Sequence, residues 1–266
     1  MPAAACQRRR QGRGRKLTDM NDAADPQHPD NPEQQVRIEL ARLYRLVAHF
    51  RMTDLVDTHI SARVPGSDKH FLINAYGVQF QHMRPQDLVR IDAAGEAVDG
   101  TSEGRRVNVA GFVIHSAVHM ARHDLQCVIH THTADGIAVA CMEEGLLPIS
   151  QHALKFYQRI GYHEYEGIAL DTAERERLVC NLGPHQAMIL RNHGLLVAGR
   201  SIPEAFLNLM YLERACQIQV KAAASGRKLH LPAPEVCEKT ARQYEESEGP
   251  AHARFVWESM SKLLDD

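Results

Sequence analysis

The segment Cys127-Val128-Ile129-His130-Thr131-His132-Thr133 combines a short apolar run with two histidines one residue apart. Side chains at positions i and i+2 of an extended strand point to the same face of the sheet. The segment therefore predicts a buried strand whose end carries the two imidazoles side by side. Because the chain contains 16 histidines, such a pair also arises by chance, and the pair alone does not establish a binding site.

A third histidine stands in a similar position farther along the chain. The apolar run AMIL (187–190) is followed by RNHG (191–194), so His193 also lies at a predicted strand end. Three neutral imidazoles with an open fourth position form the ligand set of a catalytic divalent metal, most often zinc. We therefore expect His130, His132 and His193 to hold a metal. Zn is the first choice, and histidine ligands alone leave Mn and Fe(II) open.

The composition predicts a globular protein with one large domain. The 266 residues are 44% hydrophobic, which is enough for a sizeable core. No stretch approaches the roughly 18 consecutive apolar residues of a membrane span, so we expect no membrane partner. The six cysteines are scattered, and neither a Cys-x-x-Cys motif nor a secretory signal is present. We therefore expect a cytoplasmic protein without disulfides.

The net charge of −2 is unevenly distributed. Residues 1–16 form a basic block without an acid, so the remaining body has more acidic than basic residues, which argues against a nucleic acid partner. Residues 1–32 contain almost no apolar side chains, and we predict that they are disordered. We favour Met20 as the true start, with residues 1–19 as translated upstream sequence.

Residues 33–266 are predicted to form one domain of mixed helices and strands. Apolar residues at helical spacing predict a first helix over 33–50, and a capping box with an early proline predicts a long helix over 201–224. Short apolar runs between turn signals predict strands. The expected strands are 57–63, 71–74, 88–92, 128–132, 187–190 and 195–198, with further helices over 109–122, 135–143 and around 255–257 and an irregular region over 151–167.

Three more histidines recur at every fourth position of the helix predicted over 109–122 and just beyond it. They are His115, His119 and His123. A metalloprotease motif would add a glutamate directly after its first histidine, and none is present here. We therefore interpret His119 and His123 as part of a polar helix face rather than as ligands.

Several longer motifs resemble the class II aldolase/adducin family. They are NVAGFVIHSAVHMARHDLQCVIHTHT (108–133), GLLPIS (145–150), YHEYEGIAL (162–170) and ILRNHGLLVAG (189–199), and they follow the family order. The resemblance implies an α/β fold, a three-layer α/β/α domain with a mainly antiparallel central sheet. It also implies a homotetramer with active sites at subunit contacts, and a divalent metal held by three histidines. Those positions match His130, His132 and His193.

The sequence departs from the sugar-phosphate aldolases of this family at the acid–base position. Those enzymes carry a glutamate four residues before a helix histidine that matches His115, and this position is Gly111 here. The carboxylate takes the substrate proton beside the metal, which glycine cannot do. Another group must therefore transfer the proton, and His115 is our first candidate.

The positions that contact phosphate in those enzymes are also changed. Two serines correspond to Val109 and Ala110, an early asparagine corresponds to His59, and a small polar residue corresponds to Tyr76. A phosphate dianion needs several donors, and most of them are missing. A sugar phosphate is therefore disfavoured as the substrate.

The leading hypothesis is a metal-dependent lyase that breaks a C–C bond in a small oxygenated or carboxylated molecule. Aldol cleavage and decarboxylation share an enolate intermediate. Because decarboxylation needs no base to start it, the loss of the glutamate favours decarboxylation. Further candidates for proton transfer are Tyr162, Tyr165 and His152, beside His163. Candidate carboxylate binders are Lys155, Arg159, Arg191 and Arg63.

Two alternatives remain open. Three histidines around Fe(II) could activate dioxygen, as in a non-haem oxygenase on the same fold. The wording VAGF before His115 and RNHGL around His193 is closer to the adducin-like branch, whose head domains have no established chemistry. A non-catalytic interaction module is therefore the third hypothesis.

Overall fold

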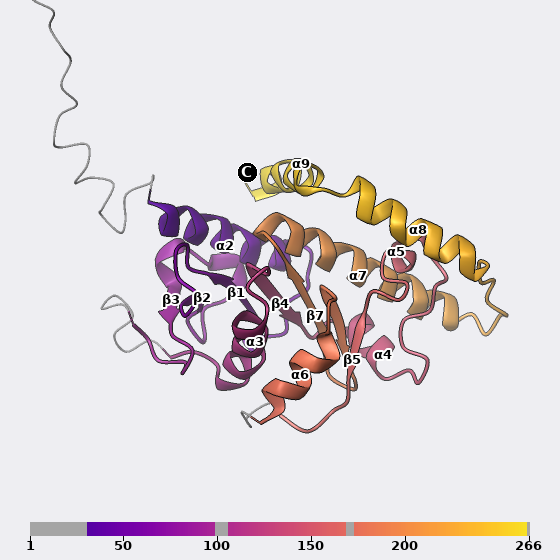
Figure 1. The fold of residues 1–266 in the computed structure, drawn as a ribbon, viewed down its shortest axis with the longest axis horizontal. Helices are drawn as coiled ribbons and strands as arrows, with labels where there is room; N and C mark the ends of the chain where they lie inside the picture. The colour runs from indigo at the N-terminus through magenta and orange to yellow at the C-terminus, as the bar shows by residue number, and fades with distance from the viewer. Residues whose placement is uncertain (1–30, 99–105, 169–172, 265–266) are drawn as a thin grey trace, which may run out of the picture.

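The computed structural model describes residues 31–98, 106–168 and 173–264, in which a seven-stranded sheet carries helices on both faces (Figure 1). Neighbouring strands pair antiparallel except β5 and β6, which are parallel. The predicted α/β class with a mainly antiparallel central sheet is therefore confirmed. In sheet order the strands are β3 (Leu88–Ile91), β2 (Phe71–Asn74), β1 (His59–Arg63), β4 (Cys127–Thr131), β7 (Gly194–Gly199), β6 (Ala187–Leu190) and β5 (Gly161–His163).

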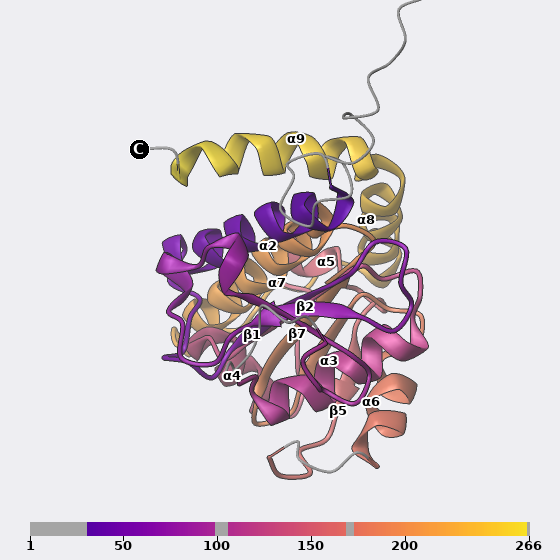
Figure 2. The same ribbon diagram turned by 90° about the vertical axis from the view of Figure 1, so that its left-hand side faces the viewer.

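The helices form one layer on each side of the sheet, as Figure 2 shows from the side. One layer contains α2 (Pro32–His49), α7 (Ile202–Ala223) and α9 (Pro250–Ser261), and the other contains α3 (Val109–Ala121) and α6 (Glu174–Leu182). The remaining helices are α4 (Ala134–Ala140), α5 (Gln151–Leu154), α8 (Pro234–Ser247) and the short 3-10 turns η1 (Phe80–His82), η2 (Pro85–Asp87) and η4 (Lys262–Leu264). Across the described ranges, no helix combines the length and the apolar character needed to cross a bilayer.

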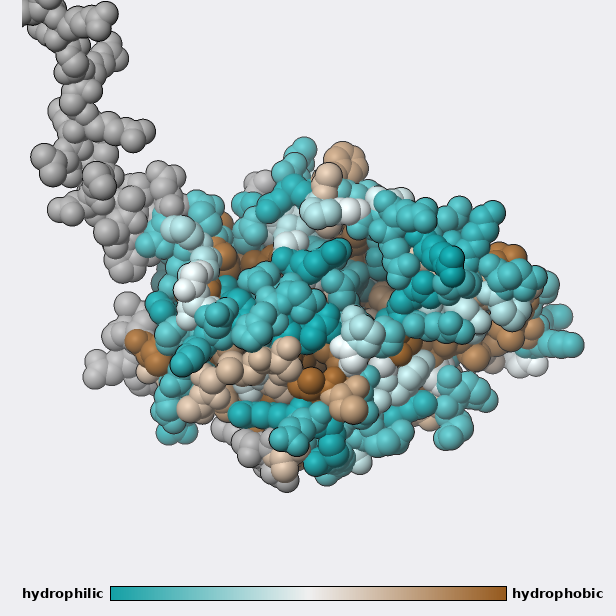
Figure 3. Space-filling view, viewed as in Figure 1, coloured by the Kyte–Doolittle hydropathy of each residue, from teal (hydrophilic) through white to brown (hydrophobic). Residues whose placement is uncertain are grey.

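Strand β4 contributes to the core on both faces of the sheet. Successive strand residues face opposite sides, so Ile129 packs with the α2 and α7 layer while Val128 packs with the α3 and α6 layer. All five residues of β4 are buried. The outer surface in the view of Figure 3 is mostly hydrophilic, as expected for helices that turn their apolar faces inward.

The first described helix begins slightly earlier than predicted. The side chain of Asn31 accepts a hydrogen bond from the backbone N–H of Glu33 at 2.9 Å, and Pro32 occupies the first turn, where its missing N–H costs nothing. Asn31 and Pro32 therefore belong to the domain rather than to the segment predicted as disordered. Residues 1–30, with Met20 and the basic block, lie outside the described residues.

Besides the 3-10 turns, four described elements were not predicted, and each has a weak local signal. The region expected to be irregular contains α5 and β5, which are only four and three residues long, and the charged stretch near the C-terminus forms α8. Helix α8 is rich in charged residues and buries only Cys237 and Ala241, so few apolar residues indicate it in the sequence. Helix α6 begins with four charged residues and was missed for the same reason.

The interpretation of His119 as part of a polar surface is wrong. Its side chain is fully buried, and its ring stacks on that of Phe71 with centroids 4.6 Å apart. Helical spacing places His119 and His115 on the same face of α3, and this face covers the sheet. His123, beyond the end of α3, has a side chain that is 58% exposed, so it matches the prediction.

Candidate metal centre

The pairing of β4 with β7 brings together the three histidines predicted as metal ligands. His130 lies on β4, His132 follows it, and His193 lies in the turn between β6 and β7. The Nε2 atom of His132 is 2.8 Å from Nε2 of His130 and 3.0 Å from Nε2 of His193. Among the described residues, these three are the histidine, cysteine or acidic side chains grouped closely enough to hold one metal ion.

Two of the three rings are fixed by hydrogen bonds on their other nitrogen. Nδ1 of His130 donates to the backbone carbonyl of Leu195 at 2.9 Å, since a carbonyl can only accept. Nδ1 of His132 lies 3.2 Å from the carboxylate of Asp54. Such contacts select the tautomer in which Nε2 is unprotonated, and they orient the ring toward a metal.

Burial keeps His130 and His193 neutral. It lowers the pKa of His130 well below its usual value, and the neighbouring imidazoles His59, His193 and His132 lower it further. Burial, followed by the proximity of His132 and His163, lowers the pKa of His193 to about 4. Neutral imidazole is the form that coordinates metals, so these two ligands are ready to bind near pH 7.

The donor set fits a divalent metal. With the Nδ1 protons of His130 and His132 committed to Leu195 and Asp54, their Nε2 lone pairs face each other at 2.8 Å without a proton between them. Facing lone pairs repel unless a cation lies between them. Three imidazole nitrogens with an open side are the arrangement that Zn, Mn or Fe(II) would accept.

The turn between β6 and β7 places His193 through a close backbone approach. Asn192 adopts a left-handed conformation with φ of 55°, which asparagine tolerates better than most residues. A Cβ atom on Gly194 would lie 2.3 Å from the backbone oxygen of Thr131, so only glycine lets β7 approach β4 there. His193, just before β7, consequently lies beside His132, just after β4.

His115 lies in a buried polar array behind the metal centre. Its Nδ1 is 2.6 Å from Oγ of Ser61, and its Nε2 is 3.3 Å from Nδ1 of His59. Burial, followed by His119, lowers its pKa to about 3, so His115 is neutral. Both of its nitrogens have protein partners, so the structure places His115 behind His59.

The other predicted acid–base residues occupy different positions. The Tyr165 ring lies 6.2 Å from the His193 ring and is half exposed, so it borders the site of its own chain. The Tyr162 hydroxyl accepts a hydrogen bond from Leu146 N–H at 3.1 Å, and burial raises its pKa. His152 lies on α5 with its ring 5.6 Å from that of Tyr211. The structure thus brings Tyr165, but not His152, beside the histidines.

The four candidate carboxylate binders are already engaged by the protein. Arg63 donates to the backbone oxygens of His119 and Asp68, and Arg191 donates to those of Met142 and Glu143. Lys155 pairs with Glu248, and Arg159 pairs with Glu238 and Glu245. Each of the four cations therefore has a structural role.

Two residues that contact the predicted ligands were not predicted from the sequence. Asp54 lies in the loop before β1, where no pattern in the sequence indicates a partner for His132. His59 was interpreted only as a lost phosphate contact, yet its ring stacks on that of His130 with centroids 5.3 Å apart. The register that pairs His59 with His130 across β1 and β4 would have indicated the second contact.

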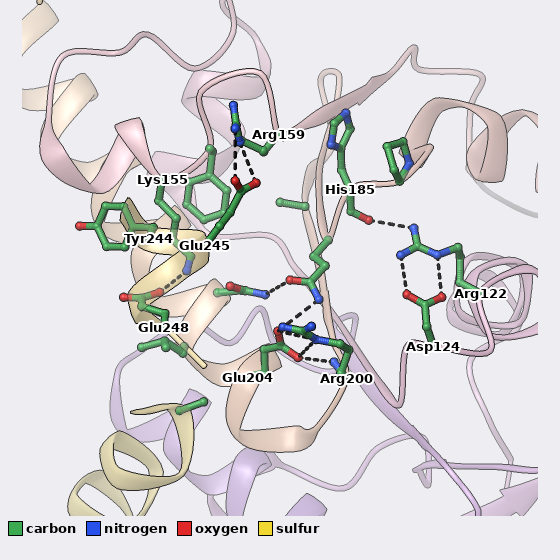
Figure 4. A pocket seen from close by; sticks show the side chains of 17 residues that line it. Arg122, Asp124, Lys155, Arg159, His185, Arg200, Glu204, Tyr244, Glu245 and Glu248 are labelled. Carbon is green, nitrogen blue, oxygen red and sulfur yellow. Dashed lines mark hydrogen bonds and ion pairs between the residues drawn. The ribbon is translucent and has the colours of Figure 1, made fainter. Parts of the chain in front are cut away.

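A groove of about 600 Å³ lies at the opposite ends of the same strands (Figure 4). Its lining includes Asp124 just before β4, Ala187 at the start of β6 and Arg200 just after β7. The arginines and the lysine labelled in Figure 4 each have a carboxylate partner. The groove is therefore distinct from the three-histidine centre.

Comparisons with known proteins agree with the fold and the motifs. Residues 38–220 match the family described as "Class II Aldolase and Adducin N-terminal domain". A Caulobacter vibrioides chain named "Putative aldolase class 2 protein" is 47% identical over 79% of this chain and 81% of its own length. Alpha-adducin from Rattus norvegicus is 41% identical over 79% of this chain, which spans 29% of the adducin.

Solved structures give the same assignment. An aldolase II superfamily protein from Pseudomonas syringae has a TM-score of 0.82 and 51% identity, covering 88% of this chain and 94% of its own. An L-fuculose 1-phosphate aldolase from Glaciozyma antarctica PI12 has a TM-score of 0.77 and 27% identity, covering 88% and 89%. The match over most of both sequence and fold shows that the chain belongs to the class II aldolase and adducin N-terminal domain family.

Proposed function

We propose that the protein is a divalent-metal-dependent lyase that cleaves a C–C bond, by aldol cleavage or decarboxylation, in a small oxygenated substrate. The observation that carries the proposal is the convergence of the Nε2 atoms of three histidines, in which His132 lies 2.8 Å from His130 and 3.0 Å from His193. His130, His132 and His193 would hold the metal, with zinc as the first choice. The metal would supply a Lewis acid that stabilises negative charge developing on substrate oxygens as the bond breaks.

The chain's own residues prepare this chemistry in two ways. Leu195 and Asp54 fix the orientation of the His130 and His132 rings before a metal or substrate binds. These side chains therefore lose less conformational freedom on binding. The burial of His130 and the β-sheet behind it restrict water on one side of the site, which strengthens electrostatic interactions there.

The substrate is proposed to be unphosphorylated, unlike that named for the Glaciozyma antarctica relative. The positions of the family's phosphate contacts hold His59, Tyr76, Val109 and Ala110 in this chain. Because the four candidate cations described above are committed to backbone oxygens and carboxylates, they do not replace those contacts. A phosphate dianion would therefore lack donors.

A homotetramer is part of the proposal, because the family resemblance implies active sites at subunit contacts. Exposed apolar side chains flank the metal centre, as expected where a second copy would pack. Leu55 follows Asp54 and is 83% exposed, while Tyr165 near His193 is 53% exposed. Light scattering in solution checks the expected mass, and a monomer at micromolar concentration would contradict this assembly.

The direct test of the function is elemental analysis of untagged protein beside the His130→Ala/His132→Ala double variant. We expect about one metal per chain in the wild-type protein and almost none in the variant. Zinc or manganese would direct the search to aldol-cleavage and decarboxylation screens. Iron would direct the search to assays of oxygen uptake. Turnover that requires oxygen would show that the protein is an oxygenase rather than a lyase.

A negative result has a defined meaning. If neither protein holds metal after incubation with Zn, Mn and Fe(II), the lyase and the Fe(II) oxygenase are both excluded. The identity to alpha-adducin would then favour an interaction module that shares only the fold.

A further inference from the structure

A fourth imidazole, that of His59, lies against the predicted metal ligands. Its ring is 3% exposed and stacks on the His130 ring, with the two planes inclined by 27°. Its Nδ1 lies 3.3 Å from Nε2 of His115. Its Nε2 forms no hydrogen bond with any residue in the described ranges, which leaves one polar atom of a buried side chain without a protein partner.

His59 fits beside the metal centre because residue 111 has no side chain. A Cβ atom on Gly111 would lie 2.5 Å from Cδ2, 2.6 Å from Cγ and 2.7 Å from Nε2 of His59. Real Cβ atoms do not approach other atoms this closely, and β1 holds the imidazole in place. The ring of His59 therefore occupies the space into which a side chain at position 111 would extend.

A buried array holds His59 in this orientation. Oγ of Ser61 lies 2.6 Å from Nδ1 of His115 and 2.8 Å from Nε2 of His119. A serine has one hydroxyl proton, so Ser61 donates to one of these rings and accepts from the other. When Ser61 donates to Nδ1 of His115, Nε2 of His115 carries the proton and donates to Nδ1 of His59. His59 then presents an N–H at Nε2.

We propose that Nε2 of His59 hydrogen-bonds an oxygen atom of the substrate held at the metal centre. His59 would thus provide the polar contact that Gly111 cannot provide, and His115 would be a positioning residue that fixes the His59 ring. This inference rests on the proposed function, since it assigns a residue to the same site. It identifies His59 and Gly111 as two departures from the sugar-phosphate aldolases that depend on each other.

The steric part of the pair is tested by a double-mutant cycle on thermal stability. Alanine normally stabilises a helix interior relative to glycine, so Gly111→Ala would raise Tm if space were free. We expect Gly111→Ala to lower Tm by several degrees instead, because the added Cβ meets the His59 ring. In a His59→Ala background the same change is expected to raise Tm. An equal Tm change in both backgrounds would overturn the pairing.

The polar contact is tested with cobalt-loaded protein and acetohydroxamate, a small chelator with two adjacent oxygens, by titrating the visible cobalt spectrum. His59→Ala is expected to weaken acetohydroxamate binding at least about tenfold, as for a lost hydrogen bond to a charged oxygen, with cobalt content unchanged. His115→Ala is expected to weaken it less, and His123→Ala, at an exposed site, not at all.

The outcomes separate this inference from the proposed function. Unchanged acetohydroxamate affinity in His59→Ala overturns the role of His59 while the metal site stands. Loss of cobalt in His59→Ala also overturns it, because His59 would then be a ligand. A wild-type protein that binds no cobalt refutes the proposed function itself, and the Tm cycle still decides whether His59 and Gly111 are a steric pair.

Discussion

The two ends of β4, β6 and β7 differ in how their polar groups are satisfied. At the groove end, Arg122 pairs with Asp124 at 2.8 Å and Arg200 with Glu204 at 2.7 Å, so the charges are already neutralised by partners. At the histidine end, the Nε2 atoms of His130, His132 and His193 converge, and the facing nitrogens of His130 and His132 have no proton between them. Converging nitrogen atoms without a charged partner therefore indicate a binding site better than the 600 Å³ groove, whose charges are already paired.

The largest expected effect comes from removing one ligand at the histidine end. His193→Ala should abolish most of the bound metal, since two imidazoles are a poor site. His185→Ala, a histidine at the groove end, is the matched control and should leave the metal content unchanged. Elemental analysis of both variants measures the contrast, and equal metal loss would show that the two ends are not independent.

Acidification should weaken the histidine end before the groove end. Burial holds the pKa of His115 and of His119 at about 3, whereas an unfolded chain takes up these protons near pH 6.5. As the pH falls from 6.5 toward 3, the unfolded state therefore binds more protons, and the free energy of unfolding falls by up to about 1.4 kcal/mol per pH unit for each histidine. Above pH 6.5 this stabilisation is fully present.

Urea unfolding of the metal-free protein at pH 7, 6 and 5 measures this slope. Hydrogen bonds to arginine lower the pKa of Glu238 to about 2, so this partner of the groove residue Arg159 does not titrate in that range. His119→Gln keeps a donor for Ser61 and removes one titrating group, so its slope should be smaller by about one proton. A slope identical to that of the wild-type protein would show that His119 is not kept neutral by folding.

A smaller effect is expected from the residue that orients His132. Asp54→Asn keeps the size of the side chain but removes the charge beside Nδ1, and losses of this kind typically weaken metal binding about 10- to 100-fold. Asp57→Asn, an exposed position in the same loop, should have no effect. Competition with a chromogenic chelator measures both affinities, and equal affinities would remove Asp54 from the site.

The smallest effect is expected at the groove end. The Arg200 side chain is 59% exposed, and exposed ion pairs contribute at most about 1 kcal/mol. Arg200→Ala should therefore reduce the free energy of unfolding by no more than about this amount and leave the metal content unchanged. A larger loss in urea unfolding would show that the paired charges of the groove support the fold more than their exposure suggests.

The parts of the candidate site that depend on local patterns could be predicted from the sequence. His130 and His132 are related by the strand period, and His193 stands at the end of an apolar run, so local reasoning selected all three. The pairing of β1 with β4 was not accessible in this way, because a strand's own pattern does not reveal its neighbour. His59 was consequently recognised only as a change from the family.

Other errors have physical causes of the same kind. Polarity and helical spacing suggested a solvent-exposed position for His119, whereas the structure places it against the sheet beside His115. Gly111 was interpreted as a lost carboxylate, whereas its backbone provides space for a ring from another strand. Asp54 lies in a loop whose position depends on the whole fold.

The place of β4 in the sheet has a consequence for the order in which the protein assembles. β4 joins the strands β1 to β3, which precede it in the chain, to β5 to β7, which follow it. His132 follows β4 and His193, 61 positions later, lies between β6 and β7, so the complete ligand set forms only when β4 has paired with the later strands. A metal bound there would cross-link β4 to these strands, and the colour of bound cobalt would report their pairing.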